Sequence, residues 1–231
     1  KYERGYKQLI NIWGADHHGY IARVKAAMEA LGFNPDKLEV LLLQKVFLYR
    51  DGELVKMSKR TGETITLDEL IEDVGVDAAR YFFLMRSLDS QLDFDINLAS
   101  SKSNDNPVYY IQYAHARIHS IFGQVKEAGI AYGDWANTSF TALQSEQEVE
   151  LIKKLAAYPE EIQLSANNKA PHRIAKYLYD VASLFHSFYK QGRIMGVDPE
   201  LQQARLGLIT ATAHVLQHGL GILGISAPEK M

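Results

Sequence analysis

The chain has 231 residues, of which 47% are hydrophobic and 23% charged, as in a globular protein of one large or two small domains. Its formal net charge of −3 excludes attraction of nucleic acid by overall charge, so RNA binding would need a local basic patch. The absence of cysteine excludes disulfide frameworks and thiolate metal sites, and no apolar run approaches the roughly 18 residues that cross a bilayer.

The predicted strands lie in the first 60 residues. Residues 9–13 predict a short buried strand, Tyr20–Leu31 a helix that ends at Gly32, and Leu38–Tyr49 a second buried strand. Strand, helix and strand in this order form the unit of a parallel sheet. Ligands of such sheets bind beyond the carboxyl ends of the strands, so residues that follow either strand are candidates for a site.

A hairpin and a basic loop follow the second strand. Asp51-Gly52 predicts the turn, and Glu53 begins the return strand. The loop then reads Lys56-Met57-Ser58-Lys59-Arg60-Thr61-Gly62. Its cations and hydroxyls are suited to binding a polyphosphate, and the alternative is a solvated basic turn.

From Thr66 onward the pattern becomes helical. Thr66 and Glu69 form a capping box, and Asp77 is expected to cap a helix over 78–88. Residues 89–103 are polar and predict an irregular linker. The further predicted helices are 107–127, 145–158 with a capping box at Ser145 and Glu148, a short helix from Pro159, 171–192, and one that begins at Asp198-Pro199 and runs to Leu223. The second half is therefore predicted to be a helix bundle without strands.

Asp16, His17 and His18 follow the first predicted strand. Asp16 could cap the next helix, which would be a purely structural role. The three residues are also typical of metal-dependent phosphoesterases, but that chemistry needs further carboxylates, and the neighbouring sequence offers no Asp-rich motif.

Tyr110, Tyr113 and Arg117 are spaced to share one face of the 107–127 helix. Such a tyrosine-rich face can be core, yet aromatic rings and arginine planes also hold unstacked RNA bases. A separate apolar face is formed by Ile111, Ala114, Ile118 and Ile121.

Basic residues accompany the 171–192 helix, either as a solvated face or as contacts to RNA phosphates. They are Lys169, His172, Arg173, Lys176, Lys190 and Arg193.

Four segments, 11–20, 56–60, 109–117 and 224–231, together resemble arginyl-tRNA synthetases, class I aminoacyl-tRNA synthetases, in the order of that family. The resemblance covers nearly the whole chain. It implies an α/β part followed by an all-α part: residues 1–65 as the terminal segment of a Rossmann-type catalytic domain, 66–105 as connecting helices that contact the tRNA stem, and 106–231 as a helical anticodon-binding domain.

The resemblance also assigns roles. Lys56, Met57, Ser58 and Lys59 match the family's KMSKS loop, in which the second lysine contacts the ATP phosphates and stabilises charge on the departing pyrophosphate. Arg60 stands where the family often has serine. Further residues are assigned to the pocket for ATP and the amino acid, namely Gly14, Asp16, His17 and His18.

The implied parent enzyme joins L-arginine to tRNA(Arg) with ATP and Mg²⁺, without a structural metal. Tyr110, Tyr113, Arg117 and Met231 would form its anticodon surface. We expect a cytoplasmic monomer with no membrane contact. Because the sequence begins at Lys1 and lacks the family's HIGH motif, we expect a carboxyl-terminal fragment that cannot activate arginine alone. Its sheet should expose an edge and apolar surface.

Three alternatives remain open from the sequence. They are a non-catalytic tRNA-binding protein derived from a synthetase, a metal-dependent phosphoesterase with a helical cap, and a synthetase for another amino acid.

Overall fold

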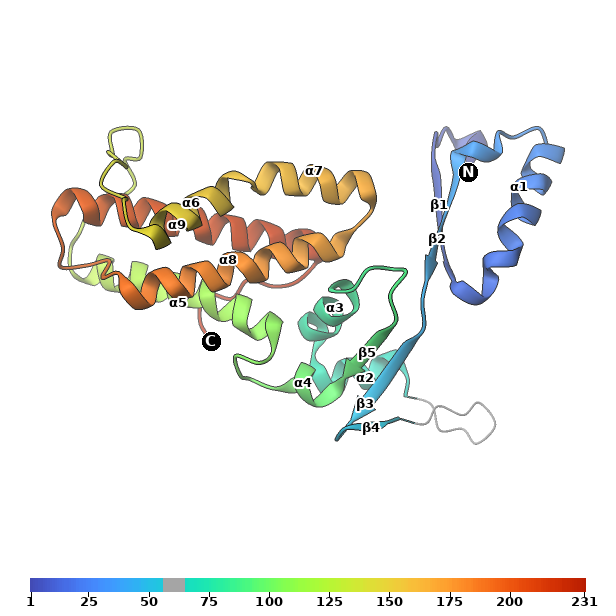
Figure 1. Ribbon diagram of the computed structural model, residues 1–231, viewed down its shortest axis with the longest axis horizontal. Coiled ribbons are helices and arrows are strands. Elements are labelled where there is room, and N and C mark those ends of the chain that lie inside the picture. Colours follow the sequence, from blue (N-terminus) through green and yellow to red (C-terminus); the bar gives the residue numbers. More distant parts are fainter. Residues whose placement is uncertain (56–64) are drawn as a thin grey trace. The chain divides into compact units, whose positions relative to one another are not determined.

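The computed structural model describes residues 1–55 and 65–231, which form two compact units (Figure 1). The first unit is Lys1–Lys56 with Arg86–Asp95, and the second is Met57–Met85 with Ile96–Met231. The predicted phosphate-binding loop, with Lys56, Met57, Ser58 and Lys59, lies outside the described residues.

The first unit begins with the predicted strand–helix–strand motif. β1 (Leu9–Gly14) leads through a 3-10 helix (Ala15–Tyr20) into α1 (Ile21–Ala30), and β2 (Leu38–Leu43) follows. β1 and β2 pair in parallel with Gly14 opposite Leu43, so both strands end at the same edge. The prediction of a parallel unit is therefore confirmed.

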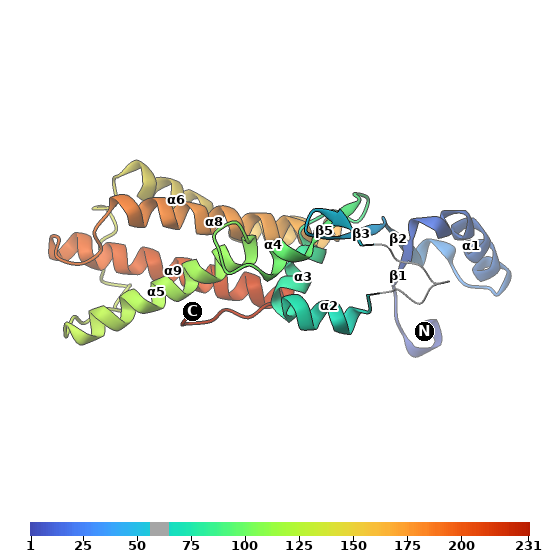
Figure 2. The same ribbon diagram turned by 90° about the horizontal axis from the view of Figure 1, so that it is seen from below.

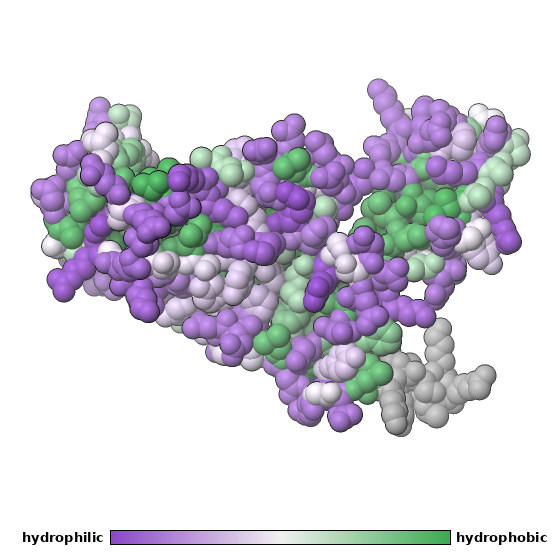
Figure 3. All heavy atoms as spheres, viewed as in Figure 1, coloured by the Kyte–Doolittle hydropathy of each residue, from purple (hydrophilic) through white to green (hydrophobic). Residues whose placement is uncertain are grey.

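The predicted burial of the first strand is wrong, because no residue of β1 is buried and one side of this strand pair is open to solvent. Ile10 and Ile12 of β1 are 46% and 62% exposed, and Leu43 of β2 is 40% exposed. Figure 3 shows the resulting apolar patch over β1 and β2. The exposed apolar surface expected from the sequence is present.

The predicted long strand over Leu38–Tyr49 is wrong, because the structure divides it. β2 ends at Leu43, and β3 (Val46–Arg50) belongs to a second sheet with the order β4–β3–β5. At the break, Gln44 N donates to Leu88 O over 2.8 Å and Lys45 O accepts from Leu92 N over 3.2 Å. The backbone groups at Gln44 and Lys45 are thus used by a segment more than 40 positions later, which removes them from the first sheet.

Strands are also not confined to the first 60 residues. β4 (Glu53–Leu54) is the predicted return strand, and positive φ angles at Asp51 and Gly52 confirm the turn before it. β5 (Leu92–Asp95) lies within the expected linker and pairs in parallel with β3. Its alternation of two buried and two exposed residues is too short a pattern to distinguish a strand from a linker.

The second unit is helical. Its elements are α2 (Leu67–Val74), α3 (Val76–Leu84), α4 (Ile96–Ser100), α5 (Pro107–Glu127), α6 (Glu146–Ala156), α7 (Tyr158–Asn168), α8 (Pro171–Gln191) and α9 (Pro199–Leu223). The predicted capping boxes at Thr66 and Ser145 and the cap at Asp198 are confirmed. The predicted cap at Asp77 is wrong, because Gly75 is the N-cap of α3 and Asp77 lies in its first turn.

α8 lies at the centre of the bundle and packs against α5, α6, α7 and α9 (Figure 2). Phe185 and Phe188 of α8 are fully buried or nearly so. α9 approaches closely at Gly219, where a Cβ atom would come within 2.5 Å of Leu178. A side chain at this glycine would therefore push the two helices apart.

α9 is long and apolar enough to cross a membrane by length and composition, but 56% of its most apolar window is buried inside the protein. Its apolar residues, including Leu206, Ile209 and Leu216, pack in the bundle core. Burial against neighbouring helices accounts for this composition without a bilayer.

Candidate nucleic-acid interface

Tyrosine and arginine side chains of α5 meet aromatic side chains of α8 along one face of the bundle. We call this surface the tyrosine–arginine face and define it as Tyr110, Tyr113, Arg117, Tyr179, His186 and Tyr189. The Tyr110 ring lies 4.6 Å from the His186 ring and 5.2 Å from the Tyr179 ring, between centroids. The two helices thus build the face together, with the Tyr110 ring between two side chains of α8.

Arg117 is held by two tyrosines. Its Nη1 donates to Tyr113 Oη over 2.9 Å, and its Cζ lies 4.2 Å from the centroid of the Tyr189 ring. The Tyr113 ring is in turn stacked on the rings of Tyr109 and His186, at 6.3 and 5.9 Å between centroids. These contacts fix the guanidinium plane, and a fixed guanidinium loses less entropy when it binds a ligand.

The face is distinct from the core side of α5. Tyr110, Tyr113 and Arg117 are half-buried. The predicted separate apolar face is confirmed, since its members are at most 3% exposed: Ile111, Ala114, Ile118 and Ile121. Tyr179 is 37% exposed. The edges of these rings are therefore held by the fold and still open to solvent.

Within residues 1–55 and 65–231, two buried nitrogen atoms on this face have no hydrogen-bond partner, Nε of Arg117 and Nε2 of His186, and the same is true of His115 Nε2 on another side of α5. Burial lowers the pKa of His186, and the nearby charge of Arg117 lowers it further, against a hydrogen bond to the Tyr110 backbone that raises it. Burial thus disfavours the charged form of this imidazole, and Arg117 supplies positive charge at the face.

The end of the chain docks elsewhere on α5. Gln112 Nε2 donates to the Ser226 carbonyl over 3.0 Å, and His115 Nδ1 lies 2.9 Å from the Pro228 carbonyl. Gln112 and His115 point to the side of α5 roughly opposite the tyrosine–arginine face. Met231, expected beside the tyrosines, is 53% exposed at the end of this tail. Its role at the tyrosine–arginine face stays a prediction.

The other candidate cluster follows β1. Asp16, His17 and His18 are exposed in the 3-10 helix after Gly14, and Asp16 Oδ1 lies 3.8 Å from Lys45 Nζ, just beyond the end of β2. The structure thus places these residues at the edge where both parallel strands end, as the sequence predicts. Among the residues that the structure describes, no group of three His, Cys, Asp or Glu side chains could hold a metal ion.

The residues on α8 were missed from the sequence. Tyr179, His186 and Tyr189 lie at spacings of seven and three, which places them on one side of a helix. This periodicity is a signal that identifies them, whereas only the basic residues of this helix are named above as candidates.

A surface that binds unstacked RNA bases needs aromatic rings and arginine side chains that the fold holds in place and leaves available for contact with RNA. The tyrosine–arginine face meets both conditions. The bundle and this face therefore predict a helical module that binds nucleic acid. The chain belongs to the family of the DALR anticodon binding domain, whose model matches residues 111–231.

Curated relatives extend the match to the whole chain. An arginine–tRNA ligase of Carboxydothermus hydrogenoformans is 55% identical over 231 residues, which are 100% of this chain and 42% of that protein. An arginine–tRNA ligase of Desulforamulus reducens is likewise 55% identical, with 41% of its length matched. The chain thus spans about two fifths of the length of these relatives.

Solved structures show the same similarity as the curated sequences. An arginyl-tRNA synthetase of Campylobacter jejuni matches 100% of this chain and 49% of its own chain, with a TM-score of 0.88 and 37% identity. The Thermus thermophilus arginyl-tRNA synthetase matches 97% of this chain and 41% of its own, with a TM-score of 0.78 and 25% identity. The resemblance predicted from the motifs is confirmed, and so is the coarse fold of small sheets with a mostly helical remainder.

Proposed function

We propose that this chain is part of an arginine–tRNA ligase and that its bundle binds the anticodon loop of tRNA(Arg). The observation that carries the proposal is the tyrosine–arginine face, where a guanidinium held by Tyr113 and Tyr189 adjoins partly open rings. The identity of 55% over the full 231 residues to arginine–tRNA ligases supports it. The reaction of the whole protein would join L-arginine to tRNA(Arg) and convert ATP to AMP and pyrophosphate.

In this proposal the bases of the loop leave their stack and pack against the rings of Tyr110 and Tyr113. Arg117 supplies a positive charge on a guanidinium held by Tyr113 and Tyr189. The His186 ring supports the rings of Tyr110 and Tyr113 from behind. Met231 would reach the same loop from the tail.

The first unit would be the terminal segment of a Rossmann-type catalytic domain. Lys59, with Lys56, Met57 and Ser58, would bind the phosphates of ATP, which enters with Mg²⁺ as substrate. Gly14, Asp16, His17 and His18 would line the pocket for ATP and arginine beyond the ends of β1 and β2. The proposed division is 1–65 for the catalytic segment, 66–105 for the connecting helices and 106–231 for the anticodon-binding domain, in a cytoplasmic, monomeric enzyme.

The test is a titration of the 231-residue chain with tRNA(Arg) and with a tRNA for another amino acid. Tyr113→Ala and Arg117→Ala should each weaken tRNA(Arg) binding about 10-fold or more, since loss of one stacked base contact costs roughly 1–3 kcal/mol. The matched control is Arg23→Ala, because Arg23 also lies over a tyrosine ring, at 5.2 Å, but in the first unit. Equal affinity for both tRNAs, or equal loss in all three variants, would contradict the proposal.

A further inference from the structure

Two histidines of α9 share one exposed face of the helix. His214 and His218 are four positions apart, so their side chains lie one turn above the other. Both side chains are exposed. The Cβ atoms of residues at this spacing are about 5–6 Å apart, and a metal ion lies about 2 Å from each imidazole nitrogen that binds it. The two rings can therefore close on one ion without a change in the backbone.

The bundle core holds the helix backbone beneath this pair. Leu216 and Leu220, on the other side of α9, are fully buried. At Gly219, next to His218, α9 comes so close to α8 that a Cβ atom would lie 2.5 Å from Leu178. Packing of this kind fixes the spacing of the two histidines before a ligand arrives, which reduces the entropy that binding costs.

His218 is also oriented by a neighbouring side chain. Its Nδ1 lies 2.8 Å from the hydroxyl oxygen of Tyr158, the first residue of α7. Burial raises the pKa of Tyr158 to about 12, so the phenol keeps its proton. When Nδ1 donates its hydrogen to this oxygen, Nε2 carries the free lone pair. Metal-binding histidines are typically held in this way, with one ring nitrogen bonded to a neighbour and the other on the metal.

The rest of the coordination shell is open to water. For the chain outside residues 56–64, the His214 side chain makes no hydrogen bond or ion pair, and no third His, Cys, Asp or Glu completes a site with the two histidines. Neutral nitrogen ligands favour ions such as Zn²⁺ and Cu²⁺. Mg²⁺ and Ca²⁺ prefer oxygen ligands, so they should bind here poorly.

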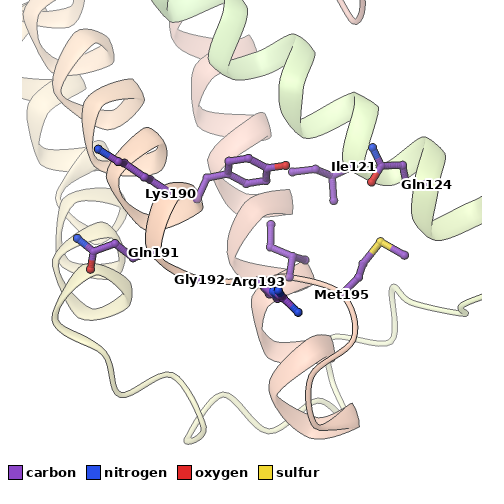
Figure 4. Close-up of a pocket in the computed structure, with 9 residues that line it drawn as sticks. Ile121, Gln124, Lys190, Gln191, Gly192, Arg193 and Met195 are labelled. Atoms are coloured by element: carbon purple, nitrogen blue, oxygen red, sulfur yellow. The ribbon is translucent and has the colours of Figure 1, made fainter.

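The charge around the pair does not oppose a cation. Lys154, four positions before Tyr158, is paired with Asp180 over 3.0 Å. A different environment is shown in Figure 4, where Lys190 and Arg193 stand at the pocket of about 400 Å³ formed by the ends of α5 and α8. Two positive charges at that pocket would repel a metal ion, whereas the histidine pair adds none when its rings are neutral.

We propose that His214 and His218 bind one divalent transition-metal ion such as Zn²⁺ or Cu²⁺, with Tyr158 as the positioning residue for His218. The ion bonds to Nε2 of His218 and to one ring nitrogen of His214, and so bridges one turn of α9. This turn lies just before Gly224, where the helix ends and the tail begins. The two histidines are not part of the tyrosine–arginine face, so the ion should bind without RNA.

The first experiment is a calorimetric titration of the intact 231-residue chain, prepared without a histidine tag, with ZnCl₂. His214→Ala and His218→Ala should each remove one Zn²⁺ site, or weaken it by at least the roughly 10–100-fold that loss of an outer-shell partner costs. The control is His17→Ala/His18→Ala, which removes two exposed histidines that are adjacent in the chain. This control should keep the site.

The second experiment tests how the site is built. Tyr158→Phe keeps the ring but removes the hydroxyl group, and it should weaken Zn²⁺ binding about 10-fold. An excess of Mg²⁺ should not displace Zn²⁺ from the natural chain. Unchanged affinity in Tyr158→Phe would overturn the positioning role of Tyr158, and displacement by Mg²⁺ would overturn the assignment of nitrogen ligands.

Thermal melts keep the interpretation clear. His214→Ala should melt like the natural chain when no metal is added, because His214 is exposed and bonds to no neighbour. Added Zn²⁺ should raise the Tm of the natural chain and not that of His214→Ala, since a ligand of the folded state alone stabilises it. If the natural chain binds no Zn²⁺, or if only His17→Ala/His18→Ala loses it, the proposal is refuted, whatever the result of the RNA titration.

Discussion

The two sides of α5 carry similar kinds of residue but use them in different ways. On the side of the tail, Gln112 and His115 bond to Ser226 and Pro228 of the same chain. In the part of the chain that the structure describes, both sides keep buried nitrogens without a hydrogen-bond partner: His115 Nε2 on the side of the tail, and Arg117 Nε and His186 Nε2 on the tyrosine–arginine face. The two sides differ in what covers them: the tail of the same chain packs on Gln112 and His115, whereas Tyr110, Tyr113 and Arg117 stay partly open to solvent.

The tail side is built around one carboxylate. Asp77 of α3 accepts from Gln112 Nε2 over 2.8 Å, from Ser226 N over 3.1 Å and from Ser226 Oγ. Arg80 Nε, one turn further along α3, donates to the Leu223 carbonyl over 2.9 Å. These bonds join α3, α5 and the end of α9, which are far apart in the sequence, so this side of α5 fixes the architecture of the second unit.

The largest expected effect is the loss of stability when the Asp77 carboxylate is removed. Asp77→Ala should lower the free energy of unfolding by roughly 2–3 kcal/mol, because it removes several hydrogen bonds to a charged group and leaves Gln112 without that acceptor. Asp105→Ala, the same change at an exposed position just before α5, should cost less than about 0.5 kcal/mol. Urea denaturation gives both values. If both variants lost a similar amount of unfolding free energy, the hydrogen bonds of Asp77 would not be what fixes the tail side of α5.

The next prediction concerns Arg117 on the tyrosine–arginine face and separates the effect of its charge on RNA affinity from the effect of its planar shape. Arg117→Lys keeps the positive charge but loses the planar guanidinium that lies over Tyr189 and bonds to Tyr113. RNA affinity should fall about 10-fold with an unchanged salt slope, since the number of charges is the same.

Arg117→Ala provides the comparison, because it should lower both the affinity and the slope. Neither change should alter the unfolding free energy by more than about 1 kcal/mol, as Arg117 is only half-buried. If lysine restores full affinity, the planar geometry proposed for this face is unnecessary.

A smaller, pH-dependent effect is expected at His115. Burial lowers its pKa, and so does the neighbouring His119, while the Pro228 carbonyl and Glu229 raise it in part. The unfolded chain therefore binds a proton at higher pH than the folded one. Docking of the tail should be strongest at a pH above about 6.5, which is the ordinary pKa of histidine. It should weaken as the pH falls from there towards the lowered pKa of His115.

Hydrogen exchange at residues 225–229 measures this locally. A local measurement is needed because His186, on the other side of α5, also has a lowered pKa. His115→Asn should remove the dependence on pH in this range. Persistence of the dependence in that variant would assign it to another group.

The parts of the fold that the sequence predicts correctly depend on neighbouring residues. The capping boxes at Thr66 and Ser145 involve residues three positions apart, and the turn at Asp51-Gly52 needs only two residues. The types of residues only a few positions apart are enough to predict such caps and turns. Helix α5 was predicted with the bounds that the structure shows for the same reason.

The missed features depend on residues far apart. β5 forms because β3, some 46 positions earlier, offers an unpaired edge, and a short alternation at Leu92 and Phe94 gives little local signal. The bond of Gln112 to Ser226 spans 114 positions. In the candidate site, Tyr110, Tyr113 and Arg117 were found from their spacing, but their partners on α8 were not, since spacing within one helix says nothing about which helix lies beside it.

The smallest effect is expected at the tip of the tail. Glu229 Oε1 lies 3.9 Å from His119 Nδ1, but its side chain is 72% exposed, so solvent screens this pair. Glu229→Gln should change the unfolding free energy by less than about 0.5 kcal/mol. It should also leave RNA affinity unchanged, because His119, the partner of Glu229, lies on the side of α5 away from the tyrosine–arginine face. A clear change in affinity on Glu229→Gln, with stability unaffected, would show that RNA contacts this part of the tail and not only Met231 at its end.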